Sequence, residues 1–139
     1  MESEAQVHTI TILVGHNLKG QALLLWGTLA AEGWLTLLPL RLATFEEVGL
    51  PVNSSDPAVW RFALASRMLL LTGNRSMKGP HSLEQTIREE NTLTSLPVIT
   101  VSSAHRLDER LYRERCGSRL IEIILDLDNY LGVGRLFIP

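Results

Sequence analysis

Short apolar runs and longer segments with helical spacing alternate along this chain. Five of the apolar runs are too short for helices and are bounded by glycine, proline or polar residues. Runs of this kind, rich in aliphatic and β-branched residues, are typical of buried strands. The pattern predicts strands at 9–15, 35–40, 68–71, 97–101 and 135–138. Pro39 lies in the second of these, which indicates an edge strand or a strand end.

Between these runs, apolar side chains recur at intervals of three and four residues, as on one face of a helix. Gly33 is a natural stop for the first helix. Ser55 or Asp56 is expected to cap the second, and Ser82 with Gln85 is expected to form a capping box for the third. The expected helices cover 18–32, 55–66, 82–91 and a last segment at 102–131 that Gly117 interrupts, with one helical turn at 45–48.

This order of elements determines the expected fold class. Strands that alternate with helices predict a parallel sheet with helices packed on both faces. The chain has 139 residues, 45% of them hydrophobic and 20% charged, which suits one domain with a sizeable core. We therefore expect residues 1–139 to form a single three-layer α/β domain with a parallel sheet of four or five strands.

Charge and cysteine content narrow the function classes only slightly. The formal net charge is −2, whereas proteins that bind nucleic acid through phosphate contacts are more often basic. Cys116 is the only cysteine, which excludes an intrachain disulfide and suits a reducing compartment. Residues 1–8 are unlike a secretory signal, and charged residues and a proline interrupt the leucine-rich run at 22–42. We expect a cytoplasmic protein without a membrane span.

Polar residues lie where three of the expected elements should meet at one edge of the sheet. His16 follows the first strand, Asp56 begins a helix, and Asn74 follows the third strand. Parallel α/β sheets place ligand sites at the carboxyl ends of their strands. We therefore expect these three side chains to lie together.

These three places resemble the motifs of PIN-like nuclease domains, in their order and spacing over residues 9–101. The PIN-like group in question begins with a strand and an Asp-Glu-Asn-Leu-type sequence, continues with Ser-Asp before a helix, and then carries strand-Thr-x-Asp. This chain has Gly-His-Asn-Leu at 15–18, Ser-Asp at 55–56 and Thr-Gly-Asn at 72–74. The resemblance implies a PIN-like fold whose acidic residues bind Mg²⁺ or Mn²⁺ and activate water for phosphodiester cleavage. Only Asp56 keeps its carboxylate, because His16 and Asn74 stand where that group has acids.

The two replaced acids change the metal chemistry that the resemblance implies. Mg²⁺ would bind poorly to a site that has lost two negative charges. His16 with Asp56 could still hold Mn²⁺, Zn²⁺ or Ni²⁺, which accept imidazole ligands. One hypothesis is a degenerate PIN-like protein with little or no nuclease activity, which binds a nucleotide, an RNA end or a protein partner. The other is an active metal-dependent ribonuclease that uses His16, Asp56 and Asn74, with Glu84 or Glu46 added.

Each of the three residues also has an explanation that needs no ligand. Asp56 before Pro57 makes a very good N-cap. Asn74 in a Gly-Asn turn suits a left-handed conformation. His16 would cap the helix that follows it. Both kinds of explanation are compatible with the sequence.

Positive charge is expected at the same edge of the sheet. The loop at 73–79 is bounded by glycines and carries Arg75 and Lys78, and Ser82 starts a helix just after it. These cations and the exposed amides of such a loop would hold an anion. The expected anion is the phosphate of a nucleotide or of RNA.

Two apolar stretches, 23–42 and 136–138, exceed the needs of a minimal core. They predict a homo-oligomer, and the resemblance favours one too because PIN-like domains commonly dimerise.

The arginines between 106 and 119 are expected to pair with nearby acids on a solvated face. Cys116 lies among them and is expected to be a half-buried structural thiol. The alternative is a thiol whose pKa the arginines lower.

Overall fold

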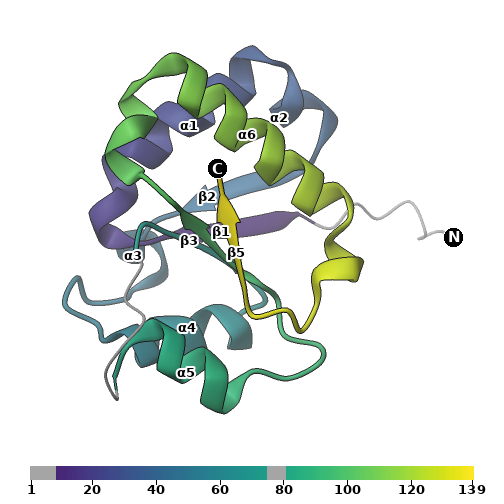
Figure 1. The fold of residues 1–139 in the computed structure, drawn as a ribbon. Coiled ribbons are helices and arrows are strands. Elements are labelled where there is room, and N and C mark those ends of the chain that lie inside the picture. The colour runs from purple at the N-terminus through teal and green to yellow at the C-terminus, as the bar shows by residue number, and fades with distance from the viewer. Residues whose placement is uncertain (1–8, 75–80) are drawn as a thin grey trace, which may run out of the picture.

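A computed structural model describes residues 9–74 and 81–139. Within these residues, five strands form one sheet in which all neighbours are parallel, in the order β2-β1-β3-β4-β5 (Figure 1). The strands are β1 (Ile10–Val14), β2 (Leu40–Ala43), β3 (Leu69–Thr72), β4 (Val98–Val101) and β5 (Arg135–Ile138). The α-helices are α1 (Lys19–Ala31), α2 (Trp34–Leu37), α3 (Phe45–Val48), α4 (Asp56–Ala65), α5 (Leu83–Glu90) and α6 (Arg110–Leu125). Short 3-10 helices cover His16–Leu18, Ala104–Asp108 and Leu127–Tyr130.

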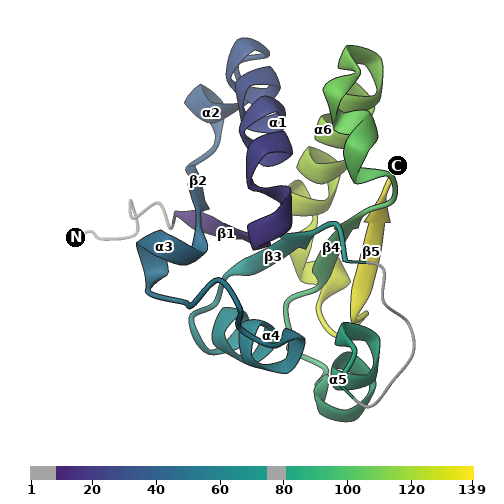
Figure 2. The ribbon, with the colours of Figure 1, turned by 90° about the vertical axis from the view of Figure 1, so that its left-hand side faces the viewer.

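Helices cover both faces of the sheet, so the molecule has three layers (Figure 2). On one face, α1 and α6 form a buried cluster with the sheet that includes Leu25, Leu120, Ile12, Leu71 and Ile99. On the other face, α4 and α5 form a cluster that includes Trp60, Ile87, Leu13, Leu70 and Val98. Because both faces are covered, successive strand residues are buried and the strands read as continuous apolar runs. The predicted three-layer α/β fold class is confirmed.

The leucine-rich stretch folds differently from its predicted helix and strand. The predicted strand at 35–40 is wrong, because Trp34–Leu37 is helix α2 and β2 begins only at Leu40. Gly33 has a left-handed φ of 87°, which lets the chain turn from α1 into α2. Pro39 lacks the N–H that a strand ladder uses, and β2 is an edge strand, as this proline indicates. No helix in the part of the chain that the structure describes is long and apolar enough to cross a membrane.

Helix α6 is continuous, so the predicted interruption at Gly117 is wrong. A Cβ atom at this position would lie 3.2 Å from Leu29 Cδ2, and glycine therefore lets α6 approach α1 closely. The helix begins at Arg110 rather than near 102, after the 3-10 helix Ala104–Asp108. The other predicted elements lie within a few residues of their expected positions.

The predicted pairing of the arginines between 106 and 119 with nearby acids is found in part. Arg106–Glu109 lies just before α6, and Arg110–Glu114 and Arg119–Glu122 lie on it. Arg113 is part-buried and donates instead to Thr28 Oγ1 and to the Leu107 carbonyl oxygen. Cys116, by contrast, is completely buried rather than half-buried. Burial disfavours the thiolate and raises the pKa of Cys116 to about 11. The alternative of a thiol activated by arginines is therefore wrong.

Candidate functional site

The strand order places a crevice between β1 and β3 at the carboxyl edge of the sheet. From β1 the chain crosses to β2 on one side, and it then returns to β3 on the other side. Such a change of direction separates the connecting segments and opens a crevice outside the strand ends, where doubly wound sheets bind their ligands. The residues that follow β1 and β3 therefore meet at this crevice.

A cavity of about 420 Å³ occupies this position. Its polar lining includes His16, Asn17, Ser54, Asp56, Thr72 and Asn74. Its apolar lining includes Phe45, Val59, Leu70 and Leu83. The structure thus brings together the three residues that the sequence nominates, His16, Asp56 and Asn74.

Asp56 and Asn74 are directly hydrogen-bonded across this pocket. Asn74 Nδ2 donates to Asp56 Oδ2 at 2.9 Å, and the Asn74 backbone N–H donates to Thr72 Oγ1 at 3.0 Å. The N-cap of α4 is Ser55, whose hydroxyl accepts from the Ala58 N–H at 3.3 Å, so the capping explanation of Asp56 is wrong. The left-handed turn suggested for Asn74 is also absent, since Arg67 alone has a positive φ among the described non-glycine residues.

His16 lies at the mouth of the pocket. It is exposed in the 3-10 helix His16–Leu18, and its ring centroid is 6.1 Å from that of Phe45. No side-chain cap hydrogen bond is found at the start of this 3-10 helix or of α1, so the predicted capping role of His16 is wrong. The side chain thus lines the pocket and does not hold a helix end.

The two additional acids proposed from sequence, Glu46 and Glu84, are engaged elsewhere. Lys19 donates a hydrogen bond to Glu46 and lowers the pKa of that exposed carboxyl. Glu84 accepts from Arg135 and is only 17% exposed. Neither acid is among the described residues that line the pocket, so Asp56 is the one carboxylate of that lining.

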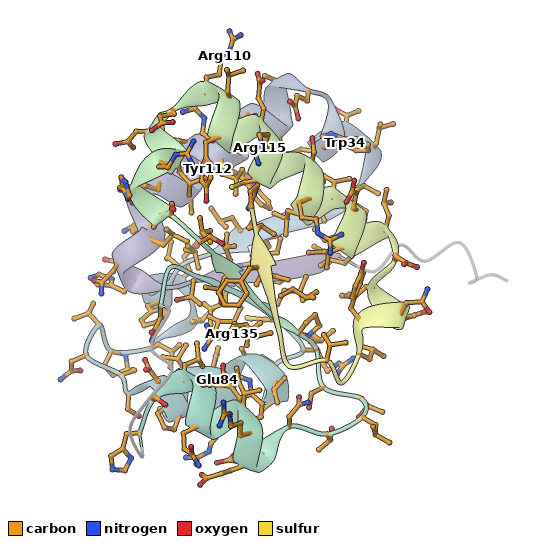
Figure 3. The ribbon with its side chains drawn as sticks, in the orientation of Figure 1. Trp34, Glu84, Arg110, Tyr112, Arg115 and Arg135 are labelled. Atoms are coloured by element: carbon orange, nitrogen blue, oxygen red, sulfur yellow. The ribbon has the colours of Figure 1, made fainter. Side chains whose placement is uncertain are left out.

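Arg135 holds the backbone of Asn74 from outside the described pocket lining, and sequence reasoning missed it. Its side chain is 5% exposed, and Figure 3 shows it and Glu84 pointing toward one another from β5 and α5. Arg135 Nη1 donates to the Asn74 carbonyl oxygen and to Thr100 Oγ1, both at 2.8 Å. Arg135 Nε donates to Glu84 Oε1 at 3.1 Å. A charged residue within a strand that is otherwise apolar was the signal that could have identified it.

The pocket lining does not fit the metal site that the sequence resemblance implies. No group of three or more His, Cys, Asp or Glu side chains within 9–74 and 81–139 could hold a metal ion. Mg²⁺ requires hard oxygen ligands in near-octahedral geometry, usually with carboxylates. Here one carboxylate oxygen of Asp56 accepts from an amide, and the buried guanidinium of Arg135 lies on the other side of Asn74.

Of the three predicted anion-binding residues, the structure describes only Ser82, which is the N-cap of α5. The Ser82 hydroxyl accepts from the Gln85 N–H at 3.1 Å, whereas the Gln85 side chain donates to Glu89. Only half of the predicted capping box is therefore formed. Ser82 is buried and is not among the described lining residues of the pocket. Arg75 and Lys78 lie outside the described residues.

Comparisons with protein-family models, curated proteins and solved structures found no match for this chain. The resemblance to PIN-like domains therefore rests on the order and spacing of the residues around His16, Asp56 and Asn74. Any function has to be argued from the pocket itself.

Proposed function

We propose that this chain is a degenerate PIN-like protein with little or no nuclease activity, whose pocket between β1 and β3 binds a nucleotide or an RNA end. The observation that carries the proposal is the hydrogen bond between Asp56 and Asn74, in a pocket whose described lining holds no second carboxylate. A carboxylate paired with an amide is suited to hydrogen bonding with hydroxyl and N–H groups. It is poorly suited to the clustered negative charge that a divalent cation needs.

Several groups at the pocket match the parts of a nucleotide. Asp56 can accept hydrogen bonds from ribose hydroxyls, as acidic residues do in dinucleotide sites. The N-terminus of α4 opens onto the pocket through Ser54 and Asp56, and helix N-termini favour phosphate. The exposed ring of His16 offers a face on which a base can stack, and the largely buried Phe45 ring lies 6.1 Å behind it. A volume of about 420 Å³ is within the range of small-molecule sites.

An active metal-dependent ribonuclease is the alternative, because His16, Asp56 and Asn74 do line one pocket. It would have to use Mn²⁺ or another ion that accepts imidazole. It would also have to act without Glu46 and Glu84, since these acids are paired with Lys19 and Arg135.

Titration calorimetry with AMP in EDTA separates these two proposals. We expect wild type to bind AMP without metal, and Asp56→Ala to bind about ten- to a hundredfold more weakly, because a charge-assisted hydrogen bond is lost. Asp128→Ala is the matched control, since Asp128 is an exposed acid outside the described pocket lining. Cleavage of a short RNA in Mn²⁺ is measured in parallel. Mn²⁺-dependent cleavage that disappears in Asp56→Ala would support the ribonuclease and contradict our proposal.

We also propose that the chain self-associates through α1 and α2. Leu23 and Leu24 on α1 are 57% and 45% exposed, and Leu37 on α2 is 71% exposed. Exposed leucines on two successive helices favour burial against a partner. The stretch at 136–138 is not part of this surface as a whole, because Ile138 is fully buried in the core.

Light scattering coupled to size exclusion tests this interface. We expect wild type to be a dimer at micromolar concentration and Leu24→Glu to be a monomer, because a charge in an apolar interface is costly to desolvate. Leu93→Glu is the matched control, since Leu93 is 89% exposed in the segment after α5. A monomeric wild type would exclude the interface. It would also be excluded if Leu24→Glu and Leu93→Glu dissociated the dimer to the same extent.

A further inference from the structure

A second hollow lies between α5 and β5, apart from the pocket at the carboxyl edge. It is a groove with a volume of about 460 Å³. Its charged residues are Glu84, Arg88 and Arg135, which together carry a net charge of +1. Glu84 and Arg135 meet between the helix and the strand in Figure 3. The groove is therefore a concave surface with a buried cation in its wall.

Two buried polar atoms of this groove have no hydrogen-bond partner among the described residues. They are Arg135 Nη2, a donor, and Asn91 Oδ1, an acceptor. The other nitrogens of the same side chains are used, since Arg135 Nε and Nη1 make three hydrogen bonds and Asn91 Nδ2 donates to the Gly132 carbonyl at 2.7 Å. A buried donor without a partner is costly and calls for an explanation. A structural role, in which Arg135 holds β5 to α5 and to the neighbouring strands, explains its three hydrogen bonds. This role does not explain the unused Nη2.

The rest of the groove is apolar. Phe137 and Val133 are 43% and 49% exposed, and Ile87 completes this part of the lining. Arg135 Cζ is 5.8 Å from the centroid of the Phe137 ring. The ring lies over the guanidinium, so a ligand that reaches the buried Arg135 Nη2 has to displace it. A molecule that satisfies the groove thus needs an anionic end and an apolar or aromatic body.

We propose that the groove between α5 and β5 binds an aromatic or apolar anion, whose phosphate or carboxylate accepts a hydrogen bond from Arg135 Nη2 and whose body packs on Phe137 and Ile87. The proposal does not depend on nucleotide binding at Asp56. Charge-assisted hydrogen bonds from arginine to such oxyanions are strong and geometrically specific.

Nitrogen-edited NMR of the whole chain tests the site with phenyl phosphate, benzoate and neutral benzyl alcohol as probes. We expect at least one of the two anions to shift the Arg135 Nε–Hε signal in a saturable way, and the alcohol to leave it unchanged. A response to phenyl phosphate alone assigns the site to phosphates, and a response to benzoate alone assigns it to carboxylates. If neither anion binds, or if the alcohol binds equally well, the proposal is wrong.

Variants of the charged residues give effects of opposite sign. Glu84→Gln removes the competing carboxylate but keeps Arg135, so anion binding should tighten. The double variant Arg135→Met with Glu84→Gln removes the charge pair together and should weaken binding at least about tenfold. Arg110→Gln is the control, because Arg110 lies on α6, outside the described lining of the groove, and it should leave binding unchanged. Arg88→Gln removes the solvated arginine of the groove and should weaken binding by less than about threefold, because the Arg88 side chain is 66% exposed. If Arg88→Gln weakens binding as much as the double variant, the anion is held by surface charge and the assignment to Arg135 fails.

Discussion

Replacement of Arg135 by methionine should lower the free energy of unfolding by about 3–5 kcal/mol, as expected when one partner of a buried ion pair is removed. The side chain is 5% exposed, and its loss leaves the largely buried Glu84 carboxylate without the guanidinium. It also removes the hydrogen bonds to the Asn74 carbonyl and to Thr100 Oγ1, which connect β5 with the end of β3 and with β4. Urea unfolding followed by tryptophan fluorescence measures the change.

Two further variants identify the cause of this loss. Addition of Glu84→Gln to Arg135→Met should recover much of the stability, because replacing both charges of a buried pair is often close to neutral. Arg88→Met removes a solvated arginine that also contacts Glu84, and it should cost less than about 1 kcal/mol. If Arg135→Met costs no more than Arg88→Met, the buried ion pair has no special role in stability.

Leu120→Ala should lower the free energy of unfolding by about 2–5 kcal/mol. Leu120 is completely buried on α6, in the cluster that joins α1, α6 and the sheet. Truncation removes apolar contacts and leaves a cavity that the close packing of α1 and α6 around Gly117 prevents from collapsing. Urea unfolding followed by tryptophan fluorescence measures this change too, so Leu120→Ala and Arg135→Met are compared with the same wild-type unfolding curve.

Leu125→Ala is the matched control for this prediction. It removes the same atoms from the last residue of the same helix, but Leu125 is 61% exposed. We expect a change within about 0.5 kcal/mol. Equal losses for the two variants would mean that α6 does not bury the face that the structure shows.

The fold class could be predicted because local patterns and the global arrangement agree. The apolar runs that became β1, β3 and β4 are flanked by residues that stop strands, and Gly33 and Ser55 mark helix ends. The segment at 35–40 failed because a short apolar run is compatible with either a strand or a helical turn. In the structure, the left-handed conformation of Gly33 turns the chain so that this segment begins as helix α2. The prediction of a break at Gly117 failed for a related reason. This glycine lets α1 pack closely against α6, and a contact between distant segments cannot be detected from the neighbouring residues alone.

The candidate site could be predicted only in part. His16, Asp56 and Asn74 were found because the carboxyl ends of parallel strands meet at one edge. Arg135 was not found, because it begins the edge strand β5 and its side chain meets Asn74, which is distant in sequence. The ion pair of Glu84 was missed for the same reason, because its partner is also Arg135. Spacing along the chain therefore indicated where the site lies but not which charges are neutralised there.

The all-parallel sheet has a consequence for how the chain folds. Every strand pairing in the described sheet joins segments that a crossover separates, such as Leu70 with Val98 and Val98 with Arg135. These contacts are non-local, so the chain must lose loop-closure entropy before the pairings stabilise it, and folding is expected to be slow. Until β5 reaches β4, the unpaired edge of β4 is available to other chains. We therefore expect the crossovers that bring Asp56 and Asn74 into one pocket also to make recovery of the protein from denaturant dependent on protein concentration.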